Sequence, residues 1–323
     1  MSPARITAGH IARHTPPGAG AQGRDAAIVD VAQDLLLRHL HQHGALGRLA
    51  FKGGTALRKL YAGTDGRFSL DLDFAVAKIT DDPDDVLTEL IAEVDGLAIS
   101  PFRYHCVERR GKWAIIYEHT LGGPAVTLQS KLDLAPPPWL PPVQRGWQPL
   151  PIHSQYGDPP LPEIWAVQLA ENLAEKISRL NRDTPARDLY DLRWAATNSS
   201  AAGPLDEALI RRLAVLKIWV DANGLHGGGH HWPPGHEGPP FDPSRWLRDR
   251  STREFDTEDM GALSPSAPTA ADLSATLRSR YRFLADIDPD EQVLARVDER
   301  DRPLALNLLA RLPGGRLSGI GLY

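Results

Sequence analysis

The strongest constraint on the fold is the alternating stretch Arg67–Phe74, which reads RFSLDLDF. Successive side chains of a β-strand point to opposite faces of the sheet. We therefore predict a strand whose core face carries the apolar residues at positions 68, 70, 72 and 74. The opposite face then carries Arg67, Ser69, Asp71 and Asp73. A chain with this pattern needs a sheet that is buried on one face and polar on the other.

The pair Asp71 and Asp73 is a candidate metal site. Two carboxylates roughly 7 Å apart along one strand repel each other, and a bound divalent cation removes that cost. Mg²⁺ prefers one or two carboxylates together with substrate phosphates. The alternative is that this acidic face simply contacts water.

The residues before this strand predict a turn that binds phosphate. Leu49–Phe51 reads as a short strand, Lys52–Thr55 (KGGT) as a sharp turn and Ala56–Ala62 as a helix. Adjacent glycines let backbone N–H groups surround an anion, and the start of a helix adds partial positive charge. The spacing is not that of a Walker loop. Gly53 and Gly54 could instead serve only a tight connection, but the two halves together favour chemistry.

The segment Lys52–Leu57 (KGGTAL), followed by Arg67–Phe74, resembles the signature of the AbiEii-type nucleotidyltransferase toxins, which include the MenT-type toxins. That family belongs to the DNA polymerase beta-like nucleotidyltransferase superfamily. The specific part is the combination of Gly-Gly-Thr, Arg-Phe-Ser and Asp-x-Asp at this spacing. The resemblance implies an α/β (α+β) fold, with a small mixed sheet in the nucleotidyltransferase core and a mainly helical C-terminal lobe.

A neighbouring strand offers a candidate third carboxylate. The stretch Val126–Leu134 alternates in polarity, so Lys131 and Asp133 share its polar face. Polymerase beta-like enzymes carry a third carboxylate on such a strand, and Asp133 is the position that fits. A base there could take the proton from an attacking hydroxyl. The alternative is a Lys131–Asp133 pair that faces the surface.

Lys176 has an unusual position in the helix predicted over Glu163–Leu180. At 100° per residue it falls within an apolar stripe. The stripe consists of Trp165, Leu169, Leu173, Ile177 and Leu180. Burying an unpaired ammonium is costly, so Lys176 should reach a protein carboxylate or a substrate phosphate. The alternative is a side chain that extends past the stripe to water.

The following helix contains a second group of charged residues. Thr184 is the expected N-cap, with a proline at the first helical position. Under the resemblance, Lys176, Arg187, Asp188 and Asp191 match the C-terminal motifs of the family in type and order. The pattern does not say which aspartate faces inward and orients Lys176 or the substrate. A purely structural Arg187–Asp191 pair, one turn apart, is the alternative.

The length of the 323-residue chain and the positions of its proline- and glycine-rich segments predict its domain organisation. We expect a flexible tail over 1–23, a nucleotidyltransferase core over 24–135, a proline-rich connection over 136–162 and a helical C-terminal lobe over 163–323. The site is expected in the cleft between core and lobe. His226, His230, His231 and His236 lie among glycines and prolines. We expect a flexible loop there rather than a metal site, because that composition excludes helical presentation of the rings.

Charge and cysteine content limit the partners and the compartment. The formal net charge of −5 gives no overall basic surface for nucleic acid, so RNA binding would depend on local patches. The main local cluster is Arg245, Arg248, Arg250 and Arg253. One cysteine, Cys106, fits a reducing compartment. Without a signal peptide or a membrane-spanning run, we expect a cytoplasmic protein and favour a monomer.

The combined prediction is metal-dependent nucleotidyl transfer with pyrophosphate as the leaving group. Asp71 and Asp73 would bind Mg²⁺ or Mn²⁺ and act in catalysis with Asp133, Lys176 and Asp188 or Asp191. The residues expected to bind the NTP are Lys52, Gly53, Gly54, Thr55, Arg58, Ser69 and Arg187.

The resemblance further implies the toxin of a toxin–antitoxin pair, with a cognate antitoxin as partner. Its implied acceptor is the 3′ end of tRNA or another RNA, and its implied donor is a pyrimidine nucleotide. Two alternatives stay open. One is nucleotidyl transfer to a protein or small molecule, and the other is an inactive module that binds nucleotide or antitoxin.

Overall fold

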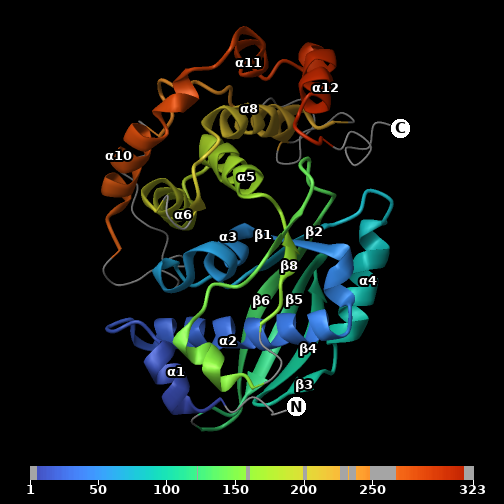
Figure 1. The fold of residues 1–323 in the computed structure, drawn as a ribbon, viewed down its shortest axis with the longest axis vertical. Coiled ribbons are helices and arrows are strands. Elements are labelled where there is room, and N and C mark those ends of the chain that lie inside the picture. The colour runs from blue at the N-terminus through green and yellow to red at the C-terminus, as the bar shows by residue number, and fades with distance from the viewer. Residues whose placement is uncertain are drawn as a thin grey trace. The chain divides into compact units, whose positions relative to one another are not determined.

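The computed structural model describes residues 6–121, 123–157, 161–198, 202–225, 232, 238–247 and 267–315. The chain divides into two compact units (Figure 1). Among the described residues, unit 1 takes those within 1–136, 142–166 and 257–267, and unit 2 takes those within 137–141, 167–256 and 268–323. Each unit has its own set of buried apolar side chains.

Unit 1 is built on one mixed sheet. Within the described residues, eight strands pair in the order β3-β4-β5-β6-β2-β1-β8-β7. The strands are β1 (Leu49–Lys52), β2 (Leu72–Val76), β3 (Ala98–Ile99), β4 (Phe102–Arg109), β5 (Lys112–His119), β6 (Val126–Ala135), β7 (Val143–Arg145) and β8 (Ile164–Ala166). The pairs β2–β6 and β1–β8 are parallel, and the other neighbours are antiparallel. The predicted mixed sheet with flanking helices is confirmed.

Helices cover this sheet. They are α1 (Ala8–His14), α2 (Gly20–Gln42), α3 (Gly53–Leu57), the π-helical turn η2 (Arg58–Ala62) that continues it, and α4 (Pro83–Val94). Short 3-10 turns are η1 (Ala45–Arg48), η3 (Gly63–Asp65) and η4 (Pro151–Gln155). The Tyr104 hydroxyl donates to the Ala32 carbonyl at 3.0 Å, and Gln33 Nε2 donates to Ser130 Oγ at 3.0 Å. These bonds join α2 to β4 and β6, across which it runs (Figure 1).

The N-terminal stretch differs from the predicted flexible tail. Residues Ala8–His14 form α1, and α2 begins at Gly20. The Ile11 side chain is fully buried, and His14 Nε2 lies 2.8 Å from Asp30 Oδ2. In the sequence, the buried Ile11 and the N-cap Thr7 are only a weak local signal for a helix. Packing against α2 supplies the partner that the local sequence does not show.

The proline-rich connection also differs from expectation. It contains β7, the last strand of the sheet, and helix α5 (Leu169–Arg182) begins after β8. Trp165, predicted on the helix, therefore lies on a strand and is 38% exposed. Prolines exclude central strands but are tolerated beside a short edge strand, where fewer backbone N–H groups must pair.

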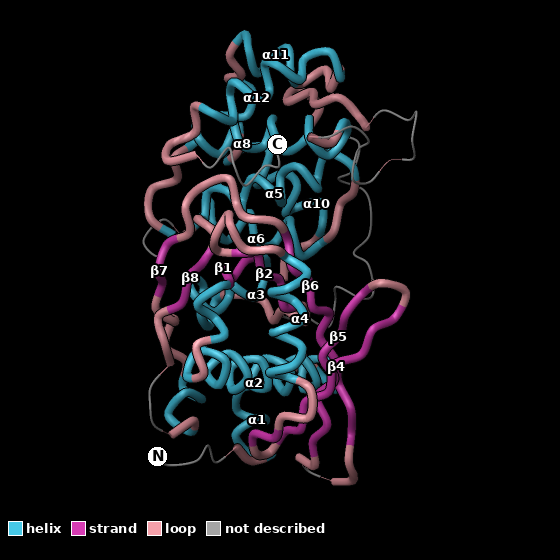
Figure 2. Tube along the Cα trace, turned by 90° about the vertical axis from the view of Figure 1, so that its right-hand side faces the viewer, coloured by secondary structure: helices cyan, strands magenta, loops and turns pink. Residues whose placement is uncertain are grey.

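Unit 2 consists of helices and loops in its described part (Figure 2). Its helices are α5, α6 (Ala186–Thr197), α8 (Glu207–Asn223), α10 (Ala270–Arg280), α11 (Pro289–Leu294) and α12 (Arg302–Ala310), with turns η6 (Arg282–Ala285) and η7 (Glu299–Asp301). The stripe residues Leu173, Ile177 and Leu180 of α5 are fully buried. The mainly helical C-terminal half is as predicted.

A buried carboxylate joins two segments of unit 2. Glu171 is fully buried on α5 and accepts hydrogen bonds from the backbone N–H groups of Trp139 and Leu140, both at 2.9 Å. Lys217 on α8 donates to the same carboxylate at 2.8 Å and lies 4.0 Å from the ring centroid of Trp139. Residues 137–141 are thereby anchored on α5 and α8. Across the described ranges, no helix is long and apolar enough to cross a membrane.

Candidate active site

The glycine turn lies directly against the acidic strand. In the β1–β2 ladder Lys52 is paired with Asp73, so Gly53 follows at the end of the strand pair. Gly53 has φ of +77°, a conformation that side chains disfavour. A Cβ atom at this position would lie 2.2 Å from Asp73 Oδ2. Glycine is therefore required here both by backbone conformation and by the nearness of the carboxylate.

The second glycine contacts the Arg-Phe-Ser segment. A Cβ atom at Gly54 would lie 2.3 Å from Arg67 Nη2 and 3.1 Å from Ser69 Oγ. Both of these polar side chains are buried. The neighbouring Thr55 is fully buried, and its hydroxyl donates to the Asp71 carbonyl. Motifs that are separate in the sequence thus form one compact group in unit 1.

The predicted strand is shorter than the alternating pattern. β2 begins at Leu72, and the residues before it are not in regular structure. Leu70, expected in the core, is 37% exposed, whereas Phe68 is buried. The Phe68 ring packs against the Arg58 guanidinium, 4.1 Å from its centroid, and edge-on to His14. These contacts replace strand pairing in the first half of the motif.

The glycine turn lies against Asp73, whose neighbour across the ladder is Asp133. Asp73 and Asp133 are partners in the parallel β2–β6 ladder, so both side chains lie on the same face of the sheet. Asp71 and Asp73 are half-buried. The Asp133 side chain is 56% exposed and forms an ion pair with Lys131. Asp133 therefore forms the expected surface pair with Lys131 and also lies beside Asp73 in the ladder.

The donor set fits a hard divalent cation. Carboxylate oxygens are the ligands that Mg²⁺ and Mn²⁺ prefer. The half-buried Asp71 and Asp73 provide them next to a turn whose glycines leave no room for a side chain.

Arg58 does not join the glycine turn as predicted. It is buried, with Nε 3.0 Å from Asp30 Oδ1 and Nη2 3.1 Å from Asp30 Oδ2. Its Nη1 donates to the carbonyls of Gly63 and Gly66. The Arg58 guanidinium is therefore engaged by α2 and by the turn after η2, rather than by residues of the glycine turn.

The buried cluster around Arg58 was missed from the sequence. Lys59 Nζ lies 2.9 Å from Asp30 Oδ1 and also contacts Asp34, whose Oδ2 accepts from the Tyr156 hydroxyl at 2.7 Å. Burial favours a raised pKa at Asp30, but Arg58, Lys59 and His14 hold that pKa well below its usual value. The available signal was two aspartates, four residues apart, within the apolar α2. The cluster anchors the helix that follows the glycine turn.

Lys176 occupies the centre of a second group, in unit 2. It is 5% exposed, and its Nζ lies 3.0 Å from Asp188 Oδ1 and 2.8 Å from Asp191 Oδ2. Asp188 and Asp191 are both buried. Both therefore face inward and contact the Lys176 ammonium. The predicted need of Lys176 for an anion is met by two protein carboxylates.

The surroundings of this group contain one correction and one addition. Pro185 is the N-cap of α6, in place of the predicted Thr184, and Arg187 is half-buried in the first turn. Arg179, which the sequence reasoning did not select, lies with Nη1 3.3 Å from Asp188 Oδ2. Arg179 is three residues after Lys176 on the same helix, so the sequence already indicated that the two side chains are neighbours.

Some predicted residues lie outside the described ranges. These are His226, His230, His231, His236, Arg248, Arg250 and Arg253.

Comparison with known proteins gives an independent assignment. The family model described as "Nucleotidyl transferase AbiEii toxin, Type IV TA system" matches residues 34–296. The solved structure of MenT4, a nucleotidyltransferase toxin from Mycobacterium tuberculosis H37Rv, is similar at 37% identity with a TM-score of 0.80. That match covers 95% of this chain and 99% of MenT4.

Two weaker results complete the comparison. JHP933 from Helicobacter pylori is 15% identical with a TM-score of 0.42, covering 87% of this chain and 98% of that one, and adds nothing to the assignment. Among curated proteins, no sequence matches this chain. The family model covers most of the chain, and the MenT4 structure matches nearly all of it. The chain therefore belongs to the AbiEii family, the nucleotidyltransferase toxins of type IV toxin–antitoxin systems.

Proposed function

We propose that this nucleotidyltransferase transfers a nucleoside monophosphate from a pyrimidine NTP to the 3′ end of tRNA and releases pyrophosphate. The observation that carries the proposal is the packing of Gly53 and Gly54 against Asp73, Arg67 and Ser69. A turn without side chains next to carboxylates lets backbone N–H groups reach phosphate oxygens beside a metal ligand. This arrangement in unit 1 supports the proposal of a site for a metal-bound triphosphate.

Asp71 and Asp73 are the proposed ligands of Mg²⁺ or Mn²⁺. When bound, such an ion supplies neutralisation of charge on the triphosphate and the leaving pyrophosphate. Thr55 holds the Asp71 backbone through its hydroxyl, so we assign it a positioning role. Asp133, the ladder partner of Asp73, is the proposed base for the attacking hydroxyl.

Lys52 and Ser69 are the proposed side-chain contacts to phosphate in unit 1. Lys52 lies opposite Asp73 in the β1–β2 ladder. The Ser69 hydroxyl is buried at the second glycine and can donate to a phosphate oxygen there. Buried hydrogen-bond donors that already point at the charge developing in the transition state need not reorganise during the reaction. Their electrostatic stabilisation of the transition state is therefore large.

Lys176, in unit 2, is a proposed cation for phosphate charge. Two buried carboxylates, Asp188 and Asp191, hold its ammonium in place. Arg187, in the first turn of α6, is a proposed nucleotide contact. This assignment is supported by the order of Lys176, Arg187, Asp188 and Asp191, which matches the family motifs.

The choice of RNA acceptor and pyrimidine donor rests on the family resemblance. Membership of a toxin–antitoxin family implies an antitoxin partner and an NTP substrate. We propose that the toxin acts as a monomer in the cytoplasm. Neutralisation by its antitoxin would then remove the activity there.

A labelling experiment tests both chemistry and acceptor. The purified chain is incubated with Mg²⁺, each α-labelled NTP in turn, and either total RNA or total protein. We expect label from CTP or UTP in the tRNA fraction. Label in protein or in small molecules instead would contradict the proposed acceptor while leaving nucleotidyl transfer intact.

The matched variants are Asp71→Asn and Asp84→Asn, an exposed aspartate at the start of α4. Asp71→Asn should reduce label transfer by about 100-fold or more, since misplaced reacting groups cost on the order of 10²-fold. Asp84→Asn should transfer at the wild-type rate. Full transfer and full toxicity in Asp71→Asn would refute the proposed site.

A further inference from the structure

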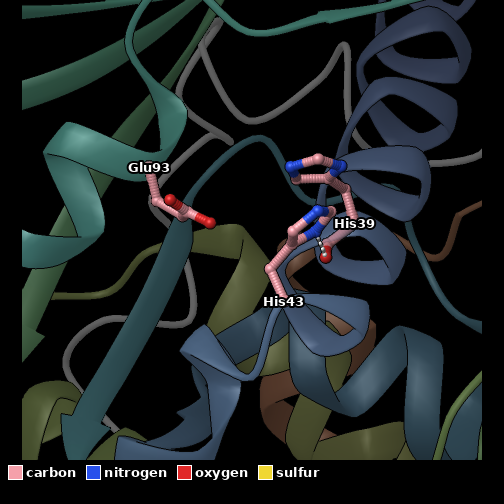
Figure 3. A group of neighbouring side chains, drawn as sticks. All are labelled: His39, His43 and Glu93. Carbon is pink, nitrogen blue, oxygen red and sulfur yellow. Dashed lines mark hydrogen bonds between the residues drawn. The ribbon is translucent and has the colours of Figure 1, made fainter.

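A second cluster of metal-ligating side chains lies in unit 1, apart from the glycine turn. His39 and His43 stand at the C-terminal end of α2, and Glu93 stands in the last turn of α4. One ligand atom from each of the three residues lies within 4.8 Å of the others. Figure 3 shows the Glu93 carboxylate directed toward the two imidazole rings. The nucleotidyl-transfer proposal uses none of these residues.

The two histidines are arranged as a chelating pair. They are four residues apart at the end of a helix, which places their side chains on one face. Their ring centroids are 4.0 Å apart, with 33° between the ring planes. His39 is half-buried, whereas His43 and Glu93 are exposed, so an ion from solvent can reach all three. A helix thus presents two nitrogen ligands together.

A hydrogen bond sets the ligand atom of His43. Its Nδ1 lies 2.9 Å from the His39 carbonyl oxygen (Figure 3). A carbonyl only accepts, so Nδ1 carries the proton and Nε2 keeps the lone pair in the neutral ring. Histidine ligands of metals commonly donate their other ring N–H to a carbonyl or carboxylate in this manner. The arrangement therefore presents Nε2 as the ligand before any ion arrives.

Electrostatics at this point favour a cation. The C-terminal end of a helix carries partial negative charge, and both α2 and α4 end here. Glu93 adds a full negative charge. Glu89, one turn earlier on α4, is engaged by Arg48 in an ion pair. Glu93 is accordingly the carboxylate of this helix that faces the histidines.

We propose that His39, His43 and Glu93 form a binding site for a divalent transition-metal ion of the zinc class, with water in the remaining position. Imidazole nitrogens select zinc, copper or nickel, whereas Mg²⁺ takes oxygen ligands. The site would join the end of α2 to the end of α4 and stabilise unit 1. It is independent of the proposed nucleotide chemistry.

The geometry requires only a small local closure. Ligand atoms around tetrahedral zinc lie roughly 3.3 Å apart, because the bonds are about 2.0–2.1 Å long. Atoms now within 4.8 Å must therefore approach by up to roughly 1.5 Å.

The test is zinc titration of the full chain by calorimetry after chelator treatment. Excess Mg²⁺ is present to occupy the carboxylates at the glycine turn. In every protein compared, the histidines at 226, 230, 231 and 236 are replaced by asparagine, so they contribute no ligand. The variants are His43→Asn and Glu93→Gln, and the matched control is His41→Asn, an exposed histidine of the same helix.

The parent should bind one zinc ion, and its thermal unfolding midpoint should rise with zinc. His43→Asn should weaken zinc binding by more than the roughly 10- to 100-fold typical of a lost outer-shell partner. Glu93→Gln should weaken it as well, and His41→Asn should bind as the parent does. The proposal is overturned if the parent binds no zinc, or if His43→Asn binds it as tightly as the parent. An equal loss in His41→Asn would also overturn it.

Discussion

Replacing Gly53 by alanine separates backbone strain from displacement of Asp73. A residue with a Cβ at φ near +77° costs roughly 1–2 kcal/mol. The added atom would also lie 2.2 Å from Asp73 Oδ2, at a position where contact normally requires more than 3 Å. The carboxylate is the end of a flexible side chain, so it can rotate away by about 1 Å with little further cost in stability.

Gly96 is the matched control in the same unit. Its φ is +79°, and a Cβ atom there would meet nothing within 4 Å. Gly96→Ala and Gly53→Ala should therefore lose similar stability, on the order of 1–2 kcal/mol. Only Gly53→Ala displaces a proposed metal ligand.

The expected difference in rate follows from that displacement. A misplacement of about 1 Å at reacting groups can cost on the order of 10²-fold, which corresponds to roughly 2.7 kcal/mol of transition-state stabilisation. Label transfer from NTP to RNA is measured for both variants below their unfolding midpoints. Gly96→Ala should retain the wild-type rate. Equal rates in the two variants would refute the argument that the contact between Gly53 and Asp73 serves catalysis.

Three further predictions concern buried charge. Lys176→Met should lower the unfolding free energy by about 3–5 kcal/mol in urea, because two buried carboxylates lose their shared cation; Arg179→Gln, 41% exposed, should cost less than about 1 kcal/mol. Although burial alone would raise the pKa of Asp30, its cationic neighbours lower that pKa in the folded protein. The contribution of Asp30 to the free energy of unfolding is therefore present above about pH 4 and is lost as the pH falls through the folded pKa. Asp30→Asn should therefore reduce the thermal midpoint at pH 7 and flatten its decline below pH 4; an unchanged acid profile would contradict this. Ser69→Asp, at a buried position, should reduce label transfer at least about tenfold by repelling the triphosphate, whereas Leu70→Asp, one residue on and exposed, should not.

Much of the candidate site was predictable because its signals are local. The alternation through Asp71 and Asp73 and the glycine pair at 53 and 54 depend on residues a few positions apart. The structure brings these segments together, and the family assignment agrees with the motifs. Turn chemistry and strand period are written in consecutive residues, so no distant contact was needed to recognise them.

The errors arose where a distant partner decides the outcome. Arg58 has the composition of a phosphate ligand, but Asp30 on α2 holds its guanidinium. The strand pattern begins too early, because Phe68 packs on Arg58 instead of continuing the ladder. Neither contact can be read from the local sequence, since each joins residues that are at least ten positions apart.

By itself, the sequence determined the mixed α/β character, the Gly-Gly-Thr and Asp-x-Asp motifs, and the need of Lys176 for an anion. Only the tertiary structure decided that both Asp188 and Asp191 meet that need, and that Asp73 lies beside Asp133 across two strands. The physical reason is that periodicity fixes the face on which a side chain lies. The partner on that face is set by packing, and a buried charge is stable only with the particular partner that packing provides.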